Sequence, residues 1–194
     1  MRMGMIGLLV LSGVLPMAAQ ARNLIINDSF DAPGDPLQGW HTDYAWTKNS
    51  HYIGNASNIS VVESEAGQRH VAKMVSPGDP GVKMESVLIP MEQGAKYRAR
   101  LKVKGQSYRI YFAGYQWRPG IRPHGDPSLQ EMRPVYRSKA ETGSAASWKT
   151  VTLELPGTEA SELSLRHLSR VRFITLYIWF GGGGFVDDVM VTKL

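Results

Sequence analysis

Short runs of alternating apolar and polar residues occupy most of this chain, and glycine, proline, asparagine and aspartate separate them. In the clearest run, residues 96–104, four apolar side chains alternate with five lysines and arginines. Side chains of a strand point alternately to its two faces, so this run predicts a strand with one apolar and one wholly basic face. Comparable runs predict further strands at residues 24–26, 59–63, 70–75, 84–89, 107–117, 148–155, 171–180 and 185–193.

This many short strands predict an all-β protein, an antiparallel β-sandwich or jelly roll. The four glycines at 181–184 predict a hairpin turn before the last strand, and residues 161–169 are expected to form a short helical turn. Residues 118–146 contain four prolines and three glycines with little periodic pattern, so we expect a long loop there. Loops of such length are usually functional or disordered, and the start of this one, with Trp117 and His124, suits one wall of a site.

The first 21 residues have the layout of a secretory signal peptide. Arg2 precedes an uncharged apolar run, and small residues close the segment at Ala19 and Ala21. The apolar run is well short of the roughly 20 residues that a membrane-spanning helix needs, so we expect no transmembrane anchor. The mature protein is expected to begin at Arg22 and to be secreted or periplasmic.

The remaining residues, 22–194, suit a single domain with a sizeable core. They contain no cysteine, so stability must come from the core, with a metal ion as the other available support. Without Arg2 they carry 21 basic and 17 acidic residues, an excess that permits an acidic partner without requiring one. Secretion argues against nucleic acid as the partner, and we expect a monomer.

Several short motifs occur in an order and spacing that cover nearly the whole of residues 22–194. They are Asn23-Leu24, Asn27 with Phe30-Asp31, Gly39-Trp40, Gly94 with Tyr97, Val103-Lys104, the run Trp148-Lys149-Thr150-Val151, and the run Phe185-Val186-Asp187-Asp188-Val189. Together they resemble the galactose-binding-like jelly rolls, especially the carbohydrate-binding modules of bacterial cellulases and xylanases. The resemblance implies a non-catalytic domain that binds polysaccharide or oligosaccharide.

The resemblance also implies a structural Ca²⁺ ion where the two ends of the domain meet. By analogy Asp31 and Asp187 would be its side-chain ligands, with main-chain oxygens from the loop after residue 50 completing the six to eight oxygens that Ca²⁺ takes. Asp31 stands where a glutamate is more typical, and Asp28 replaces a common glycine. The alternative is that Asp31 caps a turn and Asp187 pairs with a nearby base.

Strand alternation indicates which aromatic and basic residues face outward, where a sugar ring could stack and a carboxylate could pair. If the strands are neighbours in one sheet, they form a single surface, and its guanidinium groups favour an acidic polysaccharide, a uronan or a sulfated glycan. The alternative is an ordinary solvated face with basic stems over rings. The candidate ligand-binding residues are Tyr111, Tyr115, Trp117, Tyr177, Trp179, Arg98, Arg100, Lys102 and Arg109.

The remaining tryptophans are assigned by their place beside strands. Trp40 and Trp148 adjoin strand starts, where this fold class usually buries its tryptophan, so we expect both in the core. Tyr44 and Trp46 lie in an early loop and are expected at the rim of the site.

Two other classes of function stay open. The five histidines lack metal-ligand spacing, and the sequence predicts no catalytic residue. A polysaccharide lyase or glycosidase on a jelly roll is the catalytic alternative, with Tyr111, Tyr115 and His124 acting in the lyase. A module that docks proteins or cell-surface components through the same face is the third possibility.

Overall fold

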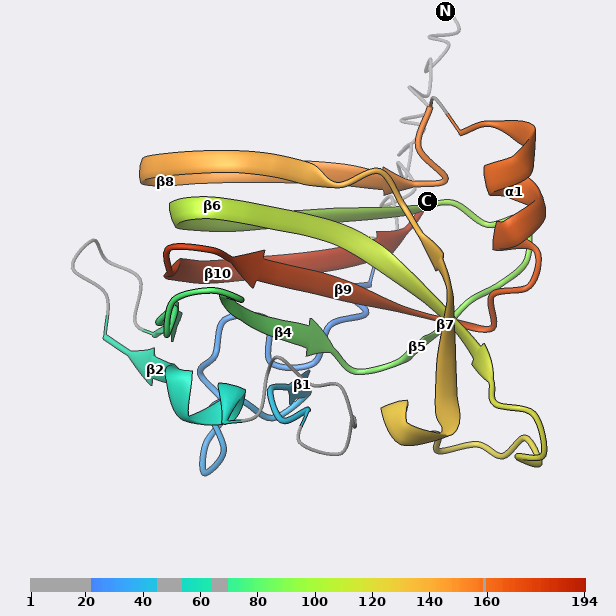
Figure 1. Cartoon of the computed structure of the whole chain (residues 1–194), viewed down its shortest axis with the longest axis horizontal. Helices are drawn as coiled ribbons and strands as arrows, with labels where there is room; N and C mark the ends of the chain where they lie inside the picture. The colour runs from blue at the N-terminus through green and yellow to red at the C-terminus, as the bar shows by residue number, and fades with distance from the viewer. Residues whose placement is uncertain (1–21, 45–53, 64–69, 159) are drawn as a thin grey trace, which may run out of the picture.

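The structure, a computed structural model, describes residues 22–44, 54–63, 70–158 and 160–194. Within these ranges, ten antiparallel strands form one continuous sheet that folds over on itself, with a short helix at one end (Figure 1). The elements are β1 (Trp40–His41), η1 (Asn55–Asn58), β2 (Ile59–Val62), β3 (Val71–Met74), β4 (Val82–Ser86), β5 (Ile89–Pro90), β6 (Tyr97–Trp117), η2 (Leu129–Glu131), β7 (Met132–Arg137), β8 (Glu141–Leu155), α1 (Glu162–Leu168), β9 (Phe173–Phe180) and β10 (Gly184–Lys193). The predicted all-β antiparallel sandwich is confirmed.

The long strand β6 belongs to both layers of the sandwich. Its N-terminal half pairs with β10 and with the C-terminal part of β8, and β10 leads on to β3 and β2; we call these strands the first layer. The first residues of β8, 141–143, pair with β6 beyond its bend. Its C-terminal half pairs with β9 and β7, and β9 leads on to β4, β5 and β1, which form the second layer. The two strands expected at residues 96–104 and 107–117 are therefore halves of one strand.

The bend of β6 lies at Gly105–Ser107. Gly105 has φ 153° and Ser107 has φ 52°, a backbone region that glycine enters at little cost and serine rarely enters. A Cβ atom at Gly105 would lie 2.5 Å from Cα of Gly184, so only glycine lets the bend pack against the β9–β10 turn. The alternation shifts by one residue there, which keeps the apolar sides of both halves turned inward.

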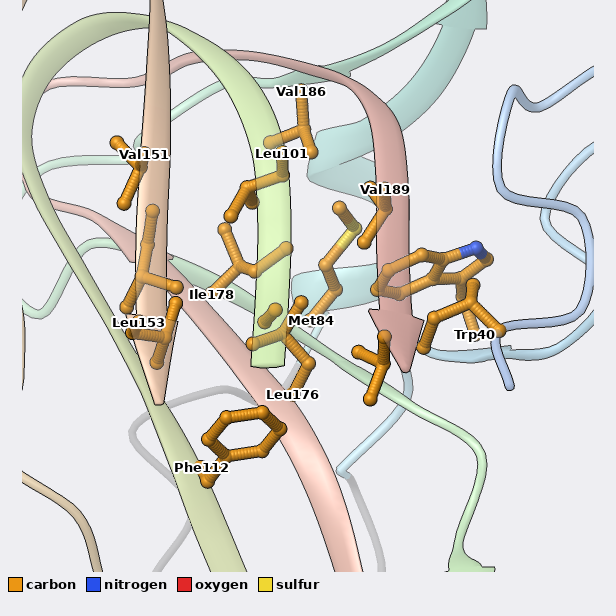
Figure 2. Close-up of a cluster of buried hydrophobic side chains, with 14 of the residues drawn as sticks. Trp40, Met84, Leu101, Phe112, Val151, Leu153, Leu176, Ile178, Val186 and Val189 are labelled. Carbon is orange, nitrogen blue, oxygen red and sulfur yellow. The ribbon is translucent and has the colours of Figure 1, made fainter. Parts of the chain in front are cut away.

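The core fills the space between the layers. Figure 2 shows first-layer side chains facing second-layer side chains, and burial of each large apolar group stabilises the fold by about 1.5–3 kcal/mol. Trp40, 7% exposed and packed on Phe30 at 5.4 Å between ring centroids, is in this core as predicted. The prediction for Trp148 is wrong, because its half-buried ring faces outward, edge-on to Phe185. The labelled core residues are Trp40, Met84, Leu101, Phe112, Val151, Leu153, Leu176, Ile178, Val186 and Val189.

The expected loop at 118–146 is shorter than predicted, because η2, β7 and the start of β8 lie inside it. The first residues of β8 are polar or small and mostly exposed, so they carry no alternation to detect. The predicted helical turn is confirmed as α1, whose N-cap Ser161 accepts a hydrogen bond from the Ser164 amide. Residues 24–26 are not a strand.

Within the described ranges, no helix has both the length and the apolar character to cross a membrane.

Candidate functional site

The nine candidate ligand-binding residues lie on two opposite faces of the sandwich. Arg98, Arg100 and Lys102 belong to the N-terminal half of β6, so they face outward from the first layer. The other six lie on the second layer, where β6 runs beside β9; they are Arg109, Tyr111, Tyr115, Trp117, Tyr177 and Trp179. The expected single surface is therefore corrected, because the bend of β6 turns its two halves away from each other.

Two of the three basic candidates on the first layer are paired with acidic groups. Arg98 contacts Glu154 at 2.7 Å, and Lys102 Nζ contacts Asp188 at 2.7 Å. Arg100 has no acidic partner among the described residues, and it lines a cavity of ≈ 300 Å³ together with Lys102. Exposed pairs of this kind contribute little to stability, but they lower the charge that a ligand would meet.

On the second layer, aromatic rings and cations line up across neighbouring strands. Tyr111 of β6 lies beside Tyr177 of β9, and the two rings stack with centroids 4.3 Å apart and planes at 18°. One step along the strands, the Arg109 guanidinium lies over the Trp179 ring at 5.4 Å, and Lys83 of β4 is the next neighbour of Trp179. We call the face made by Lys83, Glu85, Arg109, Tyr111, Tyr177 and Trp179 the stacked-tyrosine face.

A buried carboxylate lies at the centre of this outward face. Glu85 is 2% exposed, and it accepts hydrogen bonds from Tyr115 Oη at 2.5 Å and from Thr175 Oγ1 at 2.8 Å. The hydroxyl of Tyr44 donates to the same carboxylate at 3.3 Å, and Lys83 Nζ lies 3.8 Å from it. Hydroxyl donors and one cation therefore compensate for the loss of water around the charge.

The buried groups around Glu85 have shifted pKa values. Burial, and then the charge of Glu85, raise the pKa of Tyr115 and of Tyr44 far above the ordinary value of a phenol. Burial lowers the pKa of Lys83, and the nearby carboxylate partly opposes that shift. At neutral pH both phenols are therefore protonated and act as donors to Glu85.

Sequence reasoning missed Glu85, Lys83 and Thr175. A signal was present in β4, where Val82, Met84 and Ser86 are buried and alternate with Lys83 and Glu85. That alternation does not show that β4 lies next to β9, since this pairing joins segments about 90 residues apart. Tyr44 was expected at the rim and is instead buried at 2% exposure over Glu85; Trp46 lies outside the described residues.

Tyr115 and Trp117 support the face from one side. Tyr115 packs with Leu129 of η2 and Met132 of β7, and Trp117 packs edge-on against Phe173 at 5.8 Å. Tyr115 is 9% exposed. These two residues hold the loop after β6 against the second layer. Trp117 is half-buried, as are Tyr111, Tyr177 and Trp179, and Arg109 is exposed.

Two of the three residues considered for a lyase have raised pKa values, and the third is paired with a carboxylate. The hydroxyl of Tyr115 is committed to Glu85, and burial raises the pKa of Tyr111 to about 12. His124 pairs with Glu131 at 2.9 Å and packs on Trp117 at 5.0 Å. A general base needs a pKa close to the working pH, and these two phenols have moved away from it.

The two ends of the domain meet as predicted. The Leu24 amide donates to the Val191 carbonyl at 2.7 Å, and the Val189 amide donates to the Asp28 carbonyl at 3.0 Å. Asn23 joins the same contact, because its side chain accepts a hydrogen bond from the Val191 amide at 2.9 Å. The segment before β1 therefore runs antiparallel along the end of β10.

Asp187 and Asp31 lie near this junction. Asp187 is 2% exposed, and burial is the main cause that raises its pKa to about 6; the charges of Asp188 and Asp31 add to the rise. Asp31 is paired with Nδ1 of His70. A buried carboxylate with a second one close by has the oxygen chemistry that Ca²⁺ binds, although no group of three or more candidate metal-ligating side chains occurs among the described residues. Part of the loop after residue 50 falls outside those residues.

Comparison with known proteins gives a likeness of fold. No family model matches the sequence, and no curated protein sequence matches it. The enzymatically active domain of tailspike protein 4 from bacteriophage CBA120 superposes with a TM-score of 0.50 at 10% identity, covering 89% of this chain and 21% of that one. This chain therefore spans about a fifth of the tailspike structure.

Two carbohydrate-binding modules are similar as well. The CBM22-1–CBM22-2 tandem domain of Paenibacillus barcinonensis Xyn10C gives a TM-score of 0.49 at 9% identity over 81% of this chain and 47% of that one. TmCBM61, solved with β-1,4-galactotriose, gives 0.47 at 16% identity over 90% of this chain and 100% of that one. At these identities the similarity concerns the fold alone.

Proposed function

We propose that this chain is a non-catalytic carbohydrate-binding module that holds a polysaccharide on the stacked-tyrosine face. The observation that carries the proposal is the stacked pair Tyr111 and Tyr177, with Trp179 and Arg109 beside it, on the outward side of a sheet. Aromatic rings contact the apolar C–H faces of sugars, and phenol and indole groups add polar contacts. Three half-buried aromatic side chains and one guanidinium group therefore lie together on the neighbouring strands β6 and β9.

The side chains of this face are held in place before a ligand arrives. The indole N–H of Trp179 donates to the Pro80 carbonyl at 2.9 Å, and Arg109 covers the same ring. Lys83 lies 3.7 Å from the centroid of Tyr44 and 5.4 Å from that of Tyr177, while Glu85 fixes its ammonium group from below. Rotamers that are already fixed cost little entropy on binding, which favours affinity.

We propose an acidic polysaccharide as the ligand. Arg109 and Arg137 both lie against rings of this face, each 5.4 Å from its aromatic partner. Neither guanidinium has a carboxylate partner within the part of the chain that the structure describes. A guanidinium can bind a carboxylate or sulfate through two parallel hydrogen bonds, so an anionic sugar would supply the missing partner.

We further propose that Asp31 and Asp187 hold a structural Ca²⁺ ion, and that the protein acts outside the cytoplasm, as the signal-like residues 1–21 suggest. The support for the ion is the burial of Asp187 beside Asp31. Bound Ca²⁺ would neutralise the buried charge and would tie the N-terminal segment to β10. This role is separate from the ligand, because the stacked-tyrosine face belongs to the other layer.

A binding titration with matched arginine variants tests the proposed face. Uronic-acid, sulfated and neutral polysaccharides are titrated into the wild type, Trp179→Ala, Arg109→Ala and Arg100→Ala. We expect at least tenfold weaker binding of acidic glycans for the first two variants, which is about 1.4 kcal/mol, and less than twofold change for Arg100→Ala on the opposite layer.

The other outcomes each select a different function. Loss of binding only with Arg100→Ala would move the site to the first layer. Release of product during the incubation would make the chain a lyase or glycosidase, and binding of no glycan at all would favour a docking role.

A further inference from the structure

Four side chains form a row of alternating cations and rings across the outward face of the first layer. Phe185 of β10 lies beside Lys73 of β3 on one side and beside Lys104 of β6 on the other. The Lys104 ammonium is 5.9 Å from the Phe185 ring, and the Trp148 ring of β8 meets Phe185 edge-on at 6.4 Å and 60°. We call these four residues the lysine–phenylalanine row.

The row borders a groove of ≈ 810 Å³ at the bend of β6. Lys73, Lys104 and Phe185 line it, together with the β6 bend and the β9–β10 turn. The turn is built from glycines, and a Cβ at Gly182 would lie 2.9 Å from Gln106 Cβ. The absence of side chains on this turn keeps the groove open beside the row.

The two lysines of the row lack the acidic partners that two other lysines of this layer have. Lys102 is paired with Asp188, and Lys193 is paired with Glu92. Among the described residues, neither Lys73 nor Lys104 has such a carboxylate. Their strands are two apart, so at about 4.8 Å per strand their attachment points are about 10 Å from each other, with Phe185 between them.

We propose that this groove is a second binding site, which takes an anionic sugar residue of a polysaccharide. The carboxylate or sulfate group pairs with Lys73 or Lys104, and the sugar ring packs on Phe185 and Trp148. The site is independent of the stacked-tyrosine face, because its residues lie on the opposite layer. One chain with two such faces can hold two polysaccharide strands, or two stretches of one strand, and so gain avidity.

The test compares variants that remove the same charge from different places. Oligomers of polygalacturonate, dextran sulfate and neutral xylan are titrated into the full chain at low and moderate salt. The double variant Lys73→Ala/Lys104→Ala is compared with Lys96→Ala/Lys193→Ala, which loses equal charge outside the groove. We expect about tenfold weaker binding of an anionic glycan at this site for the first pair and less than twofold for the second.

A third variant separates a sugar site from a simple cation patch. Phe185→Leu keeps an apolar side chain for folding but removes the ring, and it should weaken anionic-glycan binding several-fold while its melting temperature stays close to the wild type. The Trp179→Ala background removes the proposed first site, so the second is measured alone. Polygalacturonate and dextran sulfate then distinguish carboxylate from sulfate as the bound group.

Three results would overturn the proposal. They are equal losses in the two double-lysine variants, unchanged binding in Lys73→Ala/Lys104→Ala, and equally tight binding of polyglutamate, which would assign the row to an acidic protein segment. Salt-sensitive glycan binding that disappears with Lys73→Ala/Lys104→Ala in the Trp179→Ala background would support it. Failure of the stacked-tyrosine face alone would leave this outcome unaffected.

Discussion

The hydroxyl of Tyr115 donates a hydrogen bond of 2.5 Å to Glu85, a carboxylate that is 2% exposed although its strand turns it away from the core. Two further hydroxyls, from Tyr44 and Thr175, complete the shell around it. The charge is thus stabilised by neutral donors and one lysine, an arrangement in which each member depends on the others.

Removal of this carboxylate should destabilise the domain. Glu85→Ala leaves buried hydroxyls without an acceptor, each costing about 1–3 kcal/mol, so we expect the free energy of unfolding to fall by about 3 kcal/mol. Denaturant unfolding measures the change. Glu92→Ala removes an exposed glutamate paired with Lys193, and it should change the free energy by less than about 1 kcal/mol. Equal effects of the two substitutions would show that the buried network is not important for stability.

The raised pKa of Asp187 predicts an unusual dependence of stability on pH. Its pKa is about 6 in the folded chain against an ordinary value of 3.8, so the folded state holds this proton more tightly than the unfolded state does. The contribution to stability is fully present below pH 4 and is lost as the pH rises through 6. Melting temperatures between pH 4 and pH 7 should therefore fall less steeply, or rise more, in Asp187→Asn than in the wild type. Parallel curves would contradict the assignment.

Calcium should reverse this behaviour if Asp31 and Asp187 bind it. The ion binds the ionised carboxylates, so at pH 7 it should raise the melting temperature, and a chelator should lower it. Asp187→Asn should remove the response to both. A wild type that does not respond to the chelator would retire the metal site, and lost glycan affinity without a change in melting would instead place calcium at the ligand.

Close packing at the β9–β10 turn predicts that Gly184 cannot be enlarged. A Cβ atom there would lie 2.7 Å from the Lys104 carbonyl oxygen and would also meet the Phe180 ring. Gly184→Ala is expected to lower the free energy of unfolding by about 1–3 kcal/mol. Gly125→Ala is the matched control, because no atom lies within 4 Å of its Cβ position, and it should change stability by less than about 1 kcal/mol. A neutral Gly184→Ala would mean that the turn relaxes.

The geometry at Arg109 predicts a selective effect on acidic ligands. Arg109→Lys keeps the charge near Trp179 but loses the planar fork that binds a carboxylate through two hydrogen bonds. We expect about threefold to tenfold weaker binding of uronic-acid oligosaccharides, with neutral oligosaccharides unchanged. Calorimetric titration of both ligand classes checks this. Equal weakening for both would mean that Arg109 orients the ring of Trp179 and does not contact the acid.

Local alternation in the sequence predicted the strands and most of their outward residues. Tyr177 and Trp179 were assigned to one side of their strand and Leu176 and Ile178 to the other, and the structure agrees. The bend at Gly105–Ser107 was not predictable, because it depends on the packing of Gly184, which lies far along the chain. Without the bend, the basic residues of 96–104 and the aromatics of 107–117 looked like one surface.

The site was harder to predict because its parts come from separate strands. The burial and hydrogen bonding of Glu85 depend on two contacts: β4 pairs with β9, and Tyr115 of β6 donates to the carboxylate. The order of residues in the sequence predicts neither contact. Trp148 was assigned to the core because it adjoins a strand start, where this fold class usually buries its tryptophan, yet its ring packs on Phe185 at the surface. Position beside a strand start alone does not separate a core ring from a ring that a second ring partly covers.

The antiparallel contact between residues 23–28 and 189–191 has a mechanical consequence. A force that pulls the first and last of these residues apart loads their hydrogen bonds one at a time, beginning with Leu24 and Val191, so this edge opens like a zipper. Sheared strands would instead break all their bonds together at a higher force. Such a load would thus detach the N-terminal segment first and expose the edge of β10, while the two layers stay packed.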